Sequence, residues 1–217
     1  MPRTAVFGGS FNPIHYGHLL LADDLLEILS LDRVLFVPAK HPPHKDPTRL
    51  APPEDRLAMV RLATQGHRGF SVSDIELTRP GPSFTVDTLA ALARPGQTLF
   101  LIVGSETFLD LLSWREPRRV AQLARLVIVP RVGSPFDRES KVAQKVLREI
   151  GVDGGFVTVD GGRAPDRGVI VSAAASMPIS ASELRRRVRE GRSLAFRLPP
   201  AVAEYIRSRG LYRESPA

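Results

Sequence analysis

Two histidines near the N-terminus stand where a glycine loop would meet the start of a helix. Residues 8–18 read GGSFNPIHYGH and follow a short apolar run. Paired glycines let the backbone approach a ligand closely, and a helix start offers free N–H groups and a positive dipole end to phosphate. His15 and His18 would share a helix face and could donate N–H bonds to phosphoryl oxygens, with Gly17 leaving room for the ligand between them. This spacing predicts a phosphate site.

Two simpler interpretations of this segment compete with phosphate binding. One is a glycine turn next to two ordinary histidines. Another is zinc, but no acidic residue or third histidine stands at a familiar metal spacing. The segment also differs from the G-x-G-x-x-G pattern and from the P-loop pattern. We therefore expect phosphate binding and no protein metal site.

A second segment, residues 179–185 with the sequence ISASELR, has the composition of a helix start. Ser180 or Ser182 can cap the helix, and Arg185 with the free N–H groups could hold another phosphate. The alternative is an ordinary N-cap followed by a basic helical face.

Three further positions carry suitable chemistry. Lys45, in a loop rich in Pro and His, could reach a terminal phosphate as a point charge or could simply decorate the surface. Thr85 can cap a helix that has Asp87 in its first turn. Trp114, the only tryptophan, is a core candidate whose flat face also suits a pyridinium ring.

These residues must be positioned by alternating strands and helices. We expect strands at 3–7, 34–37, 98–103, 126–129, 156–159 and 169–171, an extended segment at 70–77, and helices at 15–29, 54–64, 85–92, 107–112, 140–150, 182–189 and 200–208. The pattern predicts an α/β fold with a doubly wound, mostly parallel sheet covered by helices on both faces. In such sheets, ligands bind beyond the carboxyl ends of the strands.

The bulk composition fits one folded domain. The chain has 217 residues, of which 43% are hydrophobic, and no shift in composition marks a linker. We expect a single domain over residues 1–217, with a C-terminal helical part (about 180–212) packed on it. Cysteine is absent, which excludes disulfides, Cys-ligated metals and a thiol nucleophile.

The net charge and the distribution of apolar residues bear on partners. The charge of +7 suits a polyanionic partner or simply a solvated basic surface. A nucleic-acid-binding module would interleave aromatic and basic residues, but aromatics make up 6% and the basic stretch 185–192 has none. No run approaches the roughly 20 apolar residues of a membrane span. We expect a cytoplasmic protein without a nucleic-acid or membrane partner, and oligomerisation stays open.

The first segment resembles the H-x-G-H signature of the nucleotidyltransferase superfamily. Its longer form resembles the G-G-[ST]-F-[DN]-P-[IV]-H-x-G-H start of bacterial nicotinate-nucleotide adenylyltransferases. Residues 179–185 resemble that superfamily's I-S-x-[ST]-x-[IL]-R motif, and 38–45, 83–89 and 198–212 resemble other family segments. Asn12 stands where the family commonly has Asp, and Glu106 replaces the Asp of its G-x-D motif. The match runs from residue 4 to residue 212.

The resemblance implies a Rossmann-like fold and transfer of the adenylyl group of ATP to nicotinate mononucleotide, giving deamido-NAD and pyrophosphate. It implies Mg²⁺ carried mainly by the ATP phosphates. It implies three groups of residues: catalytic His15, His18, Lys45 and Arg185; ATP-binding Gly8, Gly9, Ser10, Phe11, Gly17, Gly104, Glu106, Ile179, Ser180 and Ser182; and nicotinate-nucleotide-binding Phe84, Thr85, Trp114 and Arg131.

Three alternatives to this activity stay open from the sequence. Another adenylyltransferase of the superfamily would act on phosphopantetheine, although that family lacks the Trp114 segment. Transfer to nicotinamide mononucleotide is the second alternative, and a degenerate, inactive homologue is the third. Asn12 and Glu106 are the departures that would point to the last.

Overall fold

The computed structural model describes residues 1–42, 46, 48, 50–130, 136–159, 167–174 and 177–213. Within them, seven parallel strands form one sheet in the order β3-β2-β1-β4-β5-β7-β6. The strands are β1 (Arg3–Gly9), β2 (Arg33–Pro38), β3 (Phe70–Val72), β4 (Thr98–Gly104), β5 (Arg125–Val129), β6 (Phe156–Val159) and β7 (Val169–Ser172). The order runs outward from the β1/β4 pair in both directions, which confirms the doubly wound fold.

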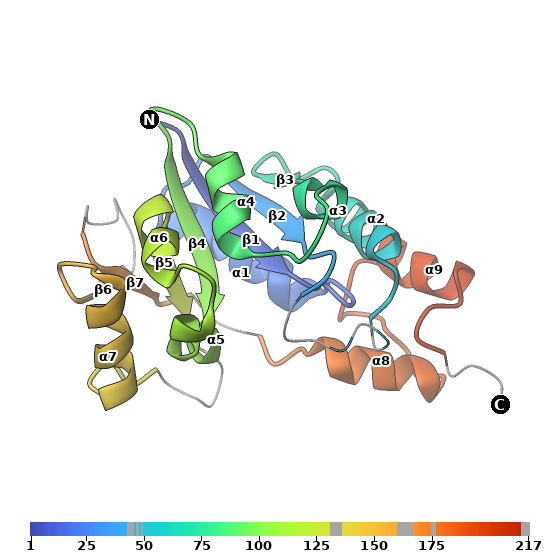
Figure 1. The fold of residues 1–217 in the computed structure, drawn as a ribbon. Coiled ribbons are helices and arrows are strands. Elements are labelled where there is room, and N and C mark those ends of the chain that lie inside the picture. Colours follow the sequence, from blue (N-terminus) through green and yellow to red (C-terminus); the bar gives the residue numbers. More distant parts are fainter. Residues whose placement is uncertain are drawn as a thin grey trace.

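Helices cover both faces of this sheet (Figure 1). They are α1 (Tyr16–Ile28), α2 (Pro53–Thr64), α3 (Ile75–Thr78), α4 (Thr85–Leu92), α5 (Ser105–Leu109), the 3₁₀ helix η2 (Leu111–Ser113), α6 (Pro117–Leu123), α7 (Lys141–Ile150), α8 (Ala181–Arg189) and α9 (Pro200–Ser208).

Alternate residues of the central strands belong to two separate hydrophobic cores, one on each face of the sheet. Ala5 packs with residues of α1, α2, α8 and α9 on one face, whereas its neighbour Val6 packs with residues of α4, α6 and α7 on the other. Because successive side chains of a strand point to opposite faces, both faces of each central strand must be apolar. The near-continuous apolar runs of β1, β4 and β5 follow from that requirement.

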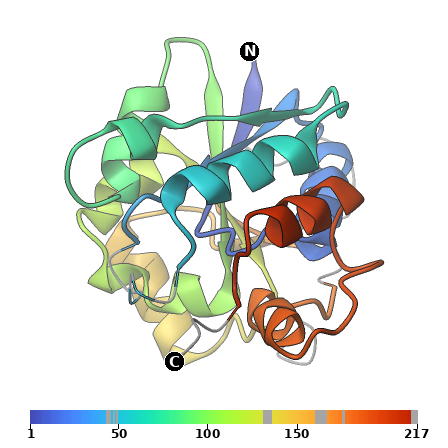
Figure 2. The ribbon, with the colours of Figure 1, turned by 90° about the vertical axis from the view of Figure 1, so that its right-hand side faces the viewer.

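The C-terminal helix α9 packs on the sheet domain through α2. Figure 2 shows α9 lying beside α2. The phenol of Tyr205 donates a 2.8 Å hydrogen bond to Asp55, and the guanidinium of Arg209 lies 3.3 Å from the same carboxylate. Asp55 is only 5% exposed, so these partners satisfy a buried charge that would otherwise be costly.

The structure differs from the sequence expectations at two places. The segment 70–77 is not extended throughout, because the strand ends at Val72 and Ile75–Thr78 form the short helix α3, whose first turn closes on the carbonyl of Asp74. As an edge strand pairing with β2 over three residues, β3 has little to extend it. Helix α6 was not expected; it has a single buried residue, Val120, so its apolar periodicity is weak.

The carboxyl ends of the central strands meet at one edge of the sheet. Gly9 pairs with Pro38, and Gly104 pairs with Val129, so the loops that follow these strands emerge together. Within the part of the chain that the structure describes, no helix is long and apolar enough to cross a bilayer.

Candidate active site

A cavity of about 670 Å³ opens at this edge, where the loop after β1 meets the start of α8. Residues 8–18 line it from one side and residues 179–185 from the other. The sequence-predicted residues that border it are Gly8, Gly9, Ser10, Phe11, His15, Gly17, His18, Gly104, Ile179, Ser180, Ser182 and Arg185. The two helix starts therefore face one shared cavity.

The two histidines pack against each other at the beginning of α1. His15 precedes the helix in an extended conformation, and its backbone N–H donates a 3.3 Å hydrogen bond to Nδ1 of His18. The two imidazole rings stack with centroids 3.8 Å apart. The edges of the Phe7 and Phe11 rings contact the His18 ring at centroid distances of 5.9 and 5.2 Å. Packing thus fixes the His18 ring before any ligand arrives.

Burial keeps His15 uncharged. The side chain is 6% exposed, and desolvation lowers its pKa from 6.5 to about 4. At neutral pH the ring is therefore a neutral imidazole, which can offer one N–H donor but no net charge.

Gly17 is required for a reason other than ligand access. A Cβ at this position would lie 3.0 Å from His15 Nδ1 and 3.6 Å from the carbonyl oxygen of Ile179. The missing side chain therefore lets the His15 ring and the segment before α8 pack together. Gly17 also borders the cavity, and the approach of a ligand to its backbone stays a prediction.

The two loop glycines differ. A Cβ on Gly9 would meet the Phe11 ring at 3.2 Å, whereas a Cβ on Gly8 would meet nothing within 4 Å. Gly9 is thus needed for packing, and Gly8 leaves open space in the cavity.

The start of α8 is tied directly to the first loop. Ser180 is the N-cap, and its Oγ accepts a 3.2 Å hydrogen bond from the N–H of Glu183, so Ser180 and not Ser182 caps the helix. Arg185 donates through Nη1 to the carbonyl oxygen of Asn12 at 2.8 Å and through Nη2 to Ser182 Oγ at 3.2 Å. Asn12, only 3% exposed, in turn accepts a 2.9 Å bond from the N–H of Ala51 through Oδ1.

A second cavity, of about 330 Å³, adjoins the first. The two share the Phe7–Ser10 loop, Ile102 and Gly104. Phe84, Thr85 and Trp114 line the second cavity together.

The rim of this second cavity carries a cation. Arg115 stacks its guanidinium over the Phe84 ring at 5.0 Å.

Helix α4 has no side-chain cap: Phe84 is the N-cap and Thr85 the first helical residue, so the expectation that Thr85 caps the helix is wrong. The uncapped first turn leaves backbone N–H groups available beside the cavity.

Three predicted residues are not placed at either cavity. Glu106 is exposed in the first turn of α5 and lines neither of them. Lys45 and Arg131 lie outside the described residues.

The buried Arg56 is a functional candidate that sequence reasoning missed. It is 0% exposed and donates to four backbone carbonyls: Ser10 at 2.8 Å, Ala39 at 2.6 Å, Lys40 at 3.1 Å and Ala51 at 2.9 Å. It thereby fixes the glycine loop against the segment after β2. The available signal was its spacing: Arg56 lies three and four residues before the buried Met59 and Val60, on the apolar face of α2.

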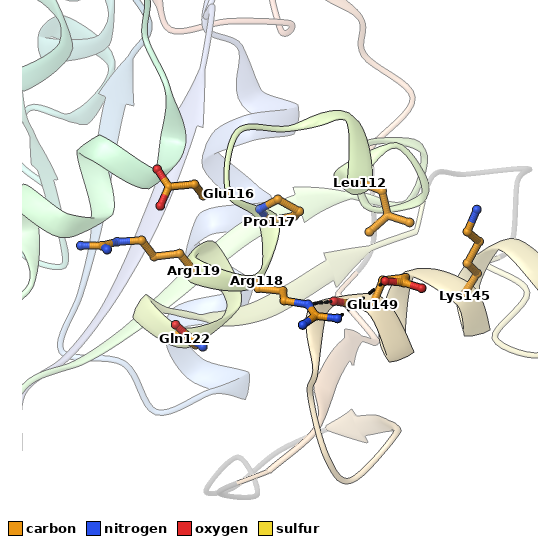
Figure 3. A pocket seen from close by; sticks show the side chains of 8 residues that line it. All are labelled: Leu112, Glu116, Pro117, Arg118, Arg119, Gln122, Lys145 and Glu149. Atoms are coloured by element: carbon orange, nitrogen blue, oxygen red, sulfur yellow. Dashed lines mark hydrogen bonds and ion pairs between the residues drawn. The ribbon is translucent and has the colours of Figure 1, made fainter.

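A third cleft lies between α6 and α7, away from the strand ends (Figure 3). Two of its charged residues pair with each other: Arg118 Nε donates to the Glu149 carbonyl oxygen at 2.6 Å, and its guanidinium lies 3.7 Å from the Glu149 carboxylate. These side chains are 69% and 54% exposed, so they form a solvated surface rather than a preorganised site. No cluster of three His, Cys, Asp or Glu side chains among the described residues could hold a metal.

Comparison with known proteins places this geometry in a family. Residues 6–187 match the family described as cytidylyltransferase-like. A probable nicotinate-nucleotide adenylyltransferase of Thermomicrobium roseum is 41% identical over 98% of this chain and 92% of its own length. That of Thermus thermophilus is 42% identical over 97% of this chain and all of its own.

A solved structure has the same fold. Nicotinic acid mononucleotide adenylyltransferase of Plasmodium falciparum, complexed with NaAD, superposes with a TM-score of 0.73 at 18% identity, over 98% of each chain. By full-length similarity to its relatives, this chain belongs to the cytidylyltransferase-like proteins and, within them, to the nicotinate-nucleotide adenylyltransferase family.

Proposed function

We propose that the chain transfers the adenylyl group of ATP to nicotinate mononucleotide, giving deamido-NAD and pyrophosphate. The observation that carries the proposal is the pair of adjoining cavities that share the Phe7–Ser10 loop. A reaction between two nucleotides needs two sites that meet at the reacting phosphate. We assign the larger cavity to ATP and the smaller, with Phe84 and Trp114, to the mononucleotide.

The chemistry needs no protein nucleophile. An anionic phosphate oxygen of the mononucleotide attacks the α-phosphorus of ATP, and the bond from that phosphorus to the β-phosphate bridging oxygen breaks. The electron pair leaves with pyrophosphate. The protein then contributes alignment and stabilisation of charge on the five-coordinate phosphorus.

Each residue group has a proposed role. His18, stacked on His15, donates to the oxygens of the α-phosphate, and Gly8 gives the triphosphate access to the backbone. Arg185 and Lys45 hold the departing pyrophosphate. Ser180 and Ser182, with Ile179, border its other side; Gly104 and Glu106 are assigned to the adenosine, and Thr85 and Arg131 to the mononucleotide.

A magnesium ion fits this site only if phosphates supply most of its ligands. Asp46 lines the ATP cavity, and no three-carboxylate or histidine cluster stands among the described residues. Mg²⁺ keeps several waters and needs few protein ligands. When bound, it would neutralise charge on the phosphate oxygens.

We also infer that residues 1–217 act as one domain. Leu184, Val202 and Ile206 of the C-terminal helices share a core with Ala5 of β1, which supports this organisation.

Pyrophosphate release from ATP, measured with nicotinate mononucleotide, nicotinamide mononucleotide and phosphopantetheine side by side, tests the function. We expect release with the first substrate at the highest kcat/KM. No release with any pyridine mononucleotide, or a preference for phosphopantetheine, would contradict the proposal.

A further inference from the structure

A buried polar cluster forms part of the wall of the smaller cavity, between α3 and α4. Glu76 is 7% exposed and Thr88 is 2% exposed, and both line the cavity together with Phe84 and Thr85. Thr88 Oγ1 donates a 2.6 Å hydrogen bond to Glu76 Oε1. A carboxylate is costly to bury without partners, so its presence here needs a reason.

The cluster holds the first turn of α4. Thr88 is one turn beyond the N-cap Phe84, and its Oγ1 also lies 3.3 Å from the Phe84 carbonyl oxygen. Arg79 donates through Nη2 to Thr88 Oγ1 at 3.0 Å and to the Phe84 carbonyl at 3.4 Å. Glu76 and Arg79 thus clamp the uncapped beginning of α4 from below.

The same cluster reaches the opposite wall of the cavity through Ser83. Ser83 Oγ accepts hydrogen bonds from the N–H groups of Lys40 and His41 at 3.2 and 3.4 Å. Burial raises the pKa of Glu76, while hydrogen bonds from Thr88 and Ser83 and the charge of Arg79 act in the opposite direction. Glu76 and Ser83 line the same cavity, and the Glu76 carboxylate is close enough to both Thr88 and Ser83 for the two hydroxyls to favour its charged form.

Arg56 holds that wall from the other side. Its guanidinium bonds the carbonyls of Ala39 and Lys40 and also the carbonyl of Ser10 in the glycine loop. The segment 39–41 is consequently held by Arg56 through its carbonyl oxygens and by Ser83 through its N–H groups.

We propose that Glu76 is a positioning residue for the pyridine mononucleotide. Through Thr88 it holds the first turn of α4, and through Ser83 it holds the segment 39–41, so that the cavity keeps the width that the pyridine ring needs. The inference rests on the proposed function of this cavity. The Glu76 carboxylate acts through Thr88 and Ser83 rather than on the reacting phosphates. Loss of the clamp should therefore weaken mononucleotide binding and spare the chemical step.

The test compares Thr88→Val with Thr64→Val, because both remove one buried hydroxyl of a helix. Thr64 Oγ1 donates within its own helix α2, to the carbonyls of Val60 and Arg61. We expect Thr88→Val to raise KM for nicotinate mononucleotide about tenfold, the usual scale for a buried hydrogen bond. KM for ATP should stay within about twofold and kcat within about threefold, and Thr64→Val should leave all three unchanged.

Variants of the carboxylate complete the test. Glu76→Ala should act as Thr88→Val does, and Glu76→Gln, which keeps an acceptor for Thr88, should restore most of the affinity. A wild-type KM for the mononucleotide in folded Thr88→Val, a parallel rise in KM for ATP, or no rescue by Gln would overturn the inference.

The experiments distinguish failure of the proposed function from failure of the positioning role of Glu76. If the wild-type protein neither releases pyrophosphate nor binds nicotinate mononucleotide in calorimetry, the proposed function fails and the inference fails with it. If wild type turns over and Thr88→Val keeps its KM, only the positioning role of Glu76 is overturned.

Discussion

Arg185 Nη1 lies 2.8 Å from the carbonyl oxygen of Asn12, although 173 residues separate them in the chain. This bond joins the N-terminal half of α8 to the loop that leads into α1. Both helix starts consequently border one cavity, where the positive ends of their dipoles favour negative charge. A triphosphate suits such a pair of helix starts, because it carries negative charge on several phosphate groups in a row.

Arg185→Lys tests the role of this link. Lysine keeps the charge but lacks the planar fork that reaches Asn12 and Ser182 together. We expect KM for ATP to rise about tenfold, the order expected for a charged hydrogen bond. Arg186→Lys is the matched control, because Arg186 pairs with Glu183 and is exposed. Equal effects of the two substitutions in steady-state kinetics would remove the assignment.

His18→Ala should lower kcat by about 10²–10³, the usual effect of losing one preorganised donor. Its ring packs against His15, Phe7 and Phe11, so the thermal midpoint should fall only by a few degrees. His67→Ala, at an exposed ring paired with Asp23, should leave kcat unchanged. An unchanged kcat in His18→Ala would show that this histidine does not stabilise the transition state.

The two loop glycines should separate binding from stability. Gly8→Ala introduces a methyl group into open cavity space, so we expect lost ATP affinity with an unchanged unfolding midpoint. Gly9→Ala presses on the Phe11 ring and should destabilise the fold by roughly 1–3 kcal/mol. Calorimetric titration with an ATP analogue and thermal unfolding of both variants check this; retained affinity in Gly8→Ala would argue against triphosphate at that position.

His15 should make stability depend on pH. Its folded-state pKa of about 4 lies below the unfolded value of 6.5, so the unfolded chain binds the proton more readily between these values. The stability contributed by keeping the ring neutral is complete above pH 6.5 and is lost as pH falls toward 4. From pH 7 to pH 5 the loss should be about 2 kcal/mol.

Urea unfolding of wild type and His15→Gln at both pH values isolates this contribution. The variant lacks the titrating group, so its free energy of unfolding should fall less between pH 7 and pH 5. Equal falls in the two proteins would mean that His15 is not a buried neutral ring.

How much the sequence could predict depended on how local each feature is. The strand at 98–103 was predictable because an unbroken apolar run suits a strand buried on both faces. Helices α3 and α6 escaped prediction because four and seven residues carry too little periodicity. The capping role of Thr85 was wrong because the helix begins at Thr85 itself, one residue earlier than a cap there would require.

The site was predictable in its parts but not in its connections. Spacing alone placed His15 and His18 on one helix start, but nothing local indicates that Arg185 meets Asn12. Family resemblance, rather than periodicity, put those segments together. The spacing of Arg56 on the apolar face of α2 indicates that it is buried but not what it binds, because the partners of Arg56 and Glu76 are carbonyls and hydroxyls that lie apart from them in sequence.

A crystal structure of the protein with a non-hydrolysable ATP analogue and nicotinate mononucleotide would test the central claim most directly. The account predicts phosphate oxygens within hydrogen-bonding distance of His18 on one side and of Ser182 or Arg185 on the other, with the pyridine ring beside Trp114. A triphosphate bound elsewhere, with the space between the starts of α1 and α8 left to solvent, would contradict it.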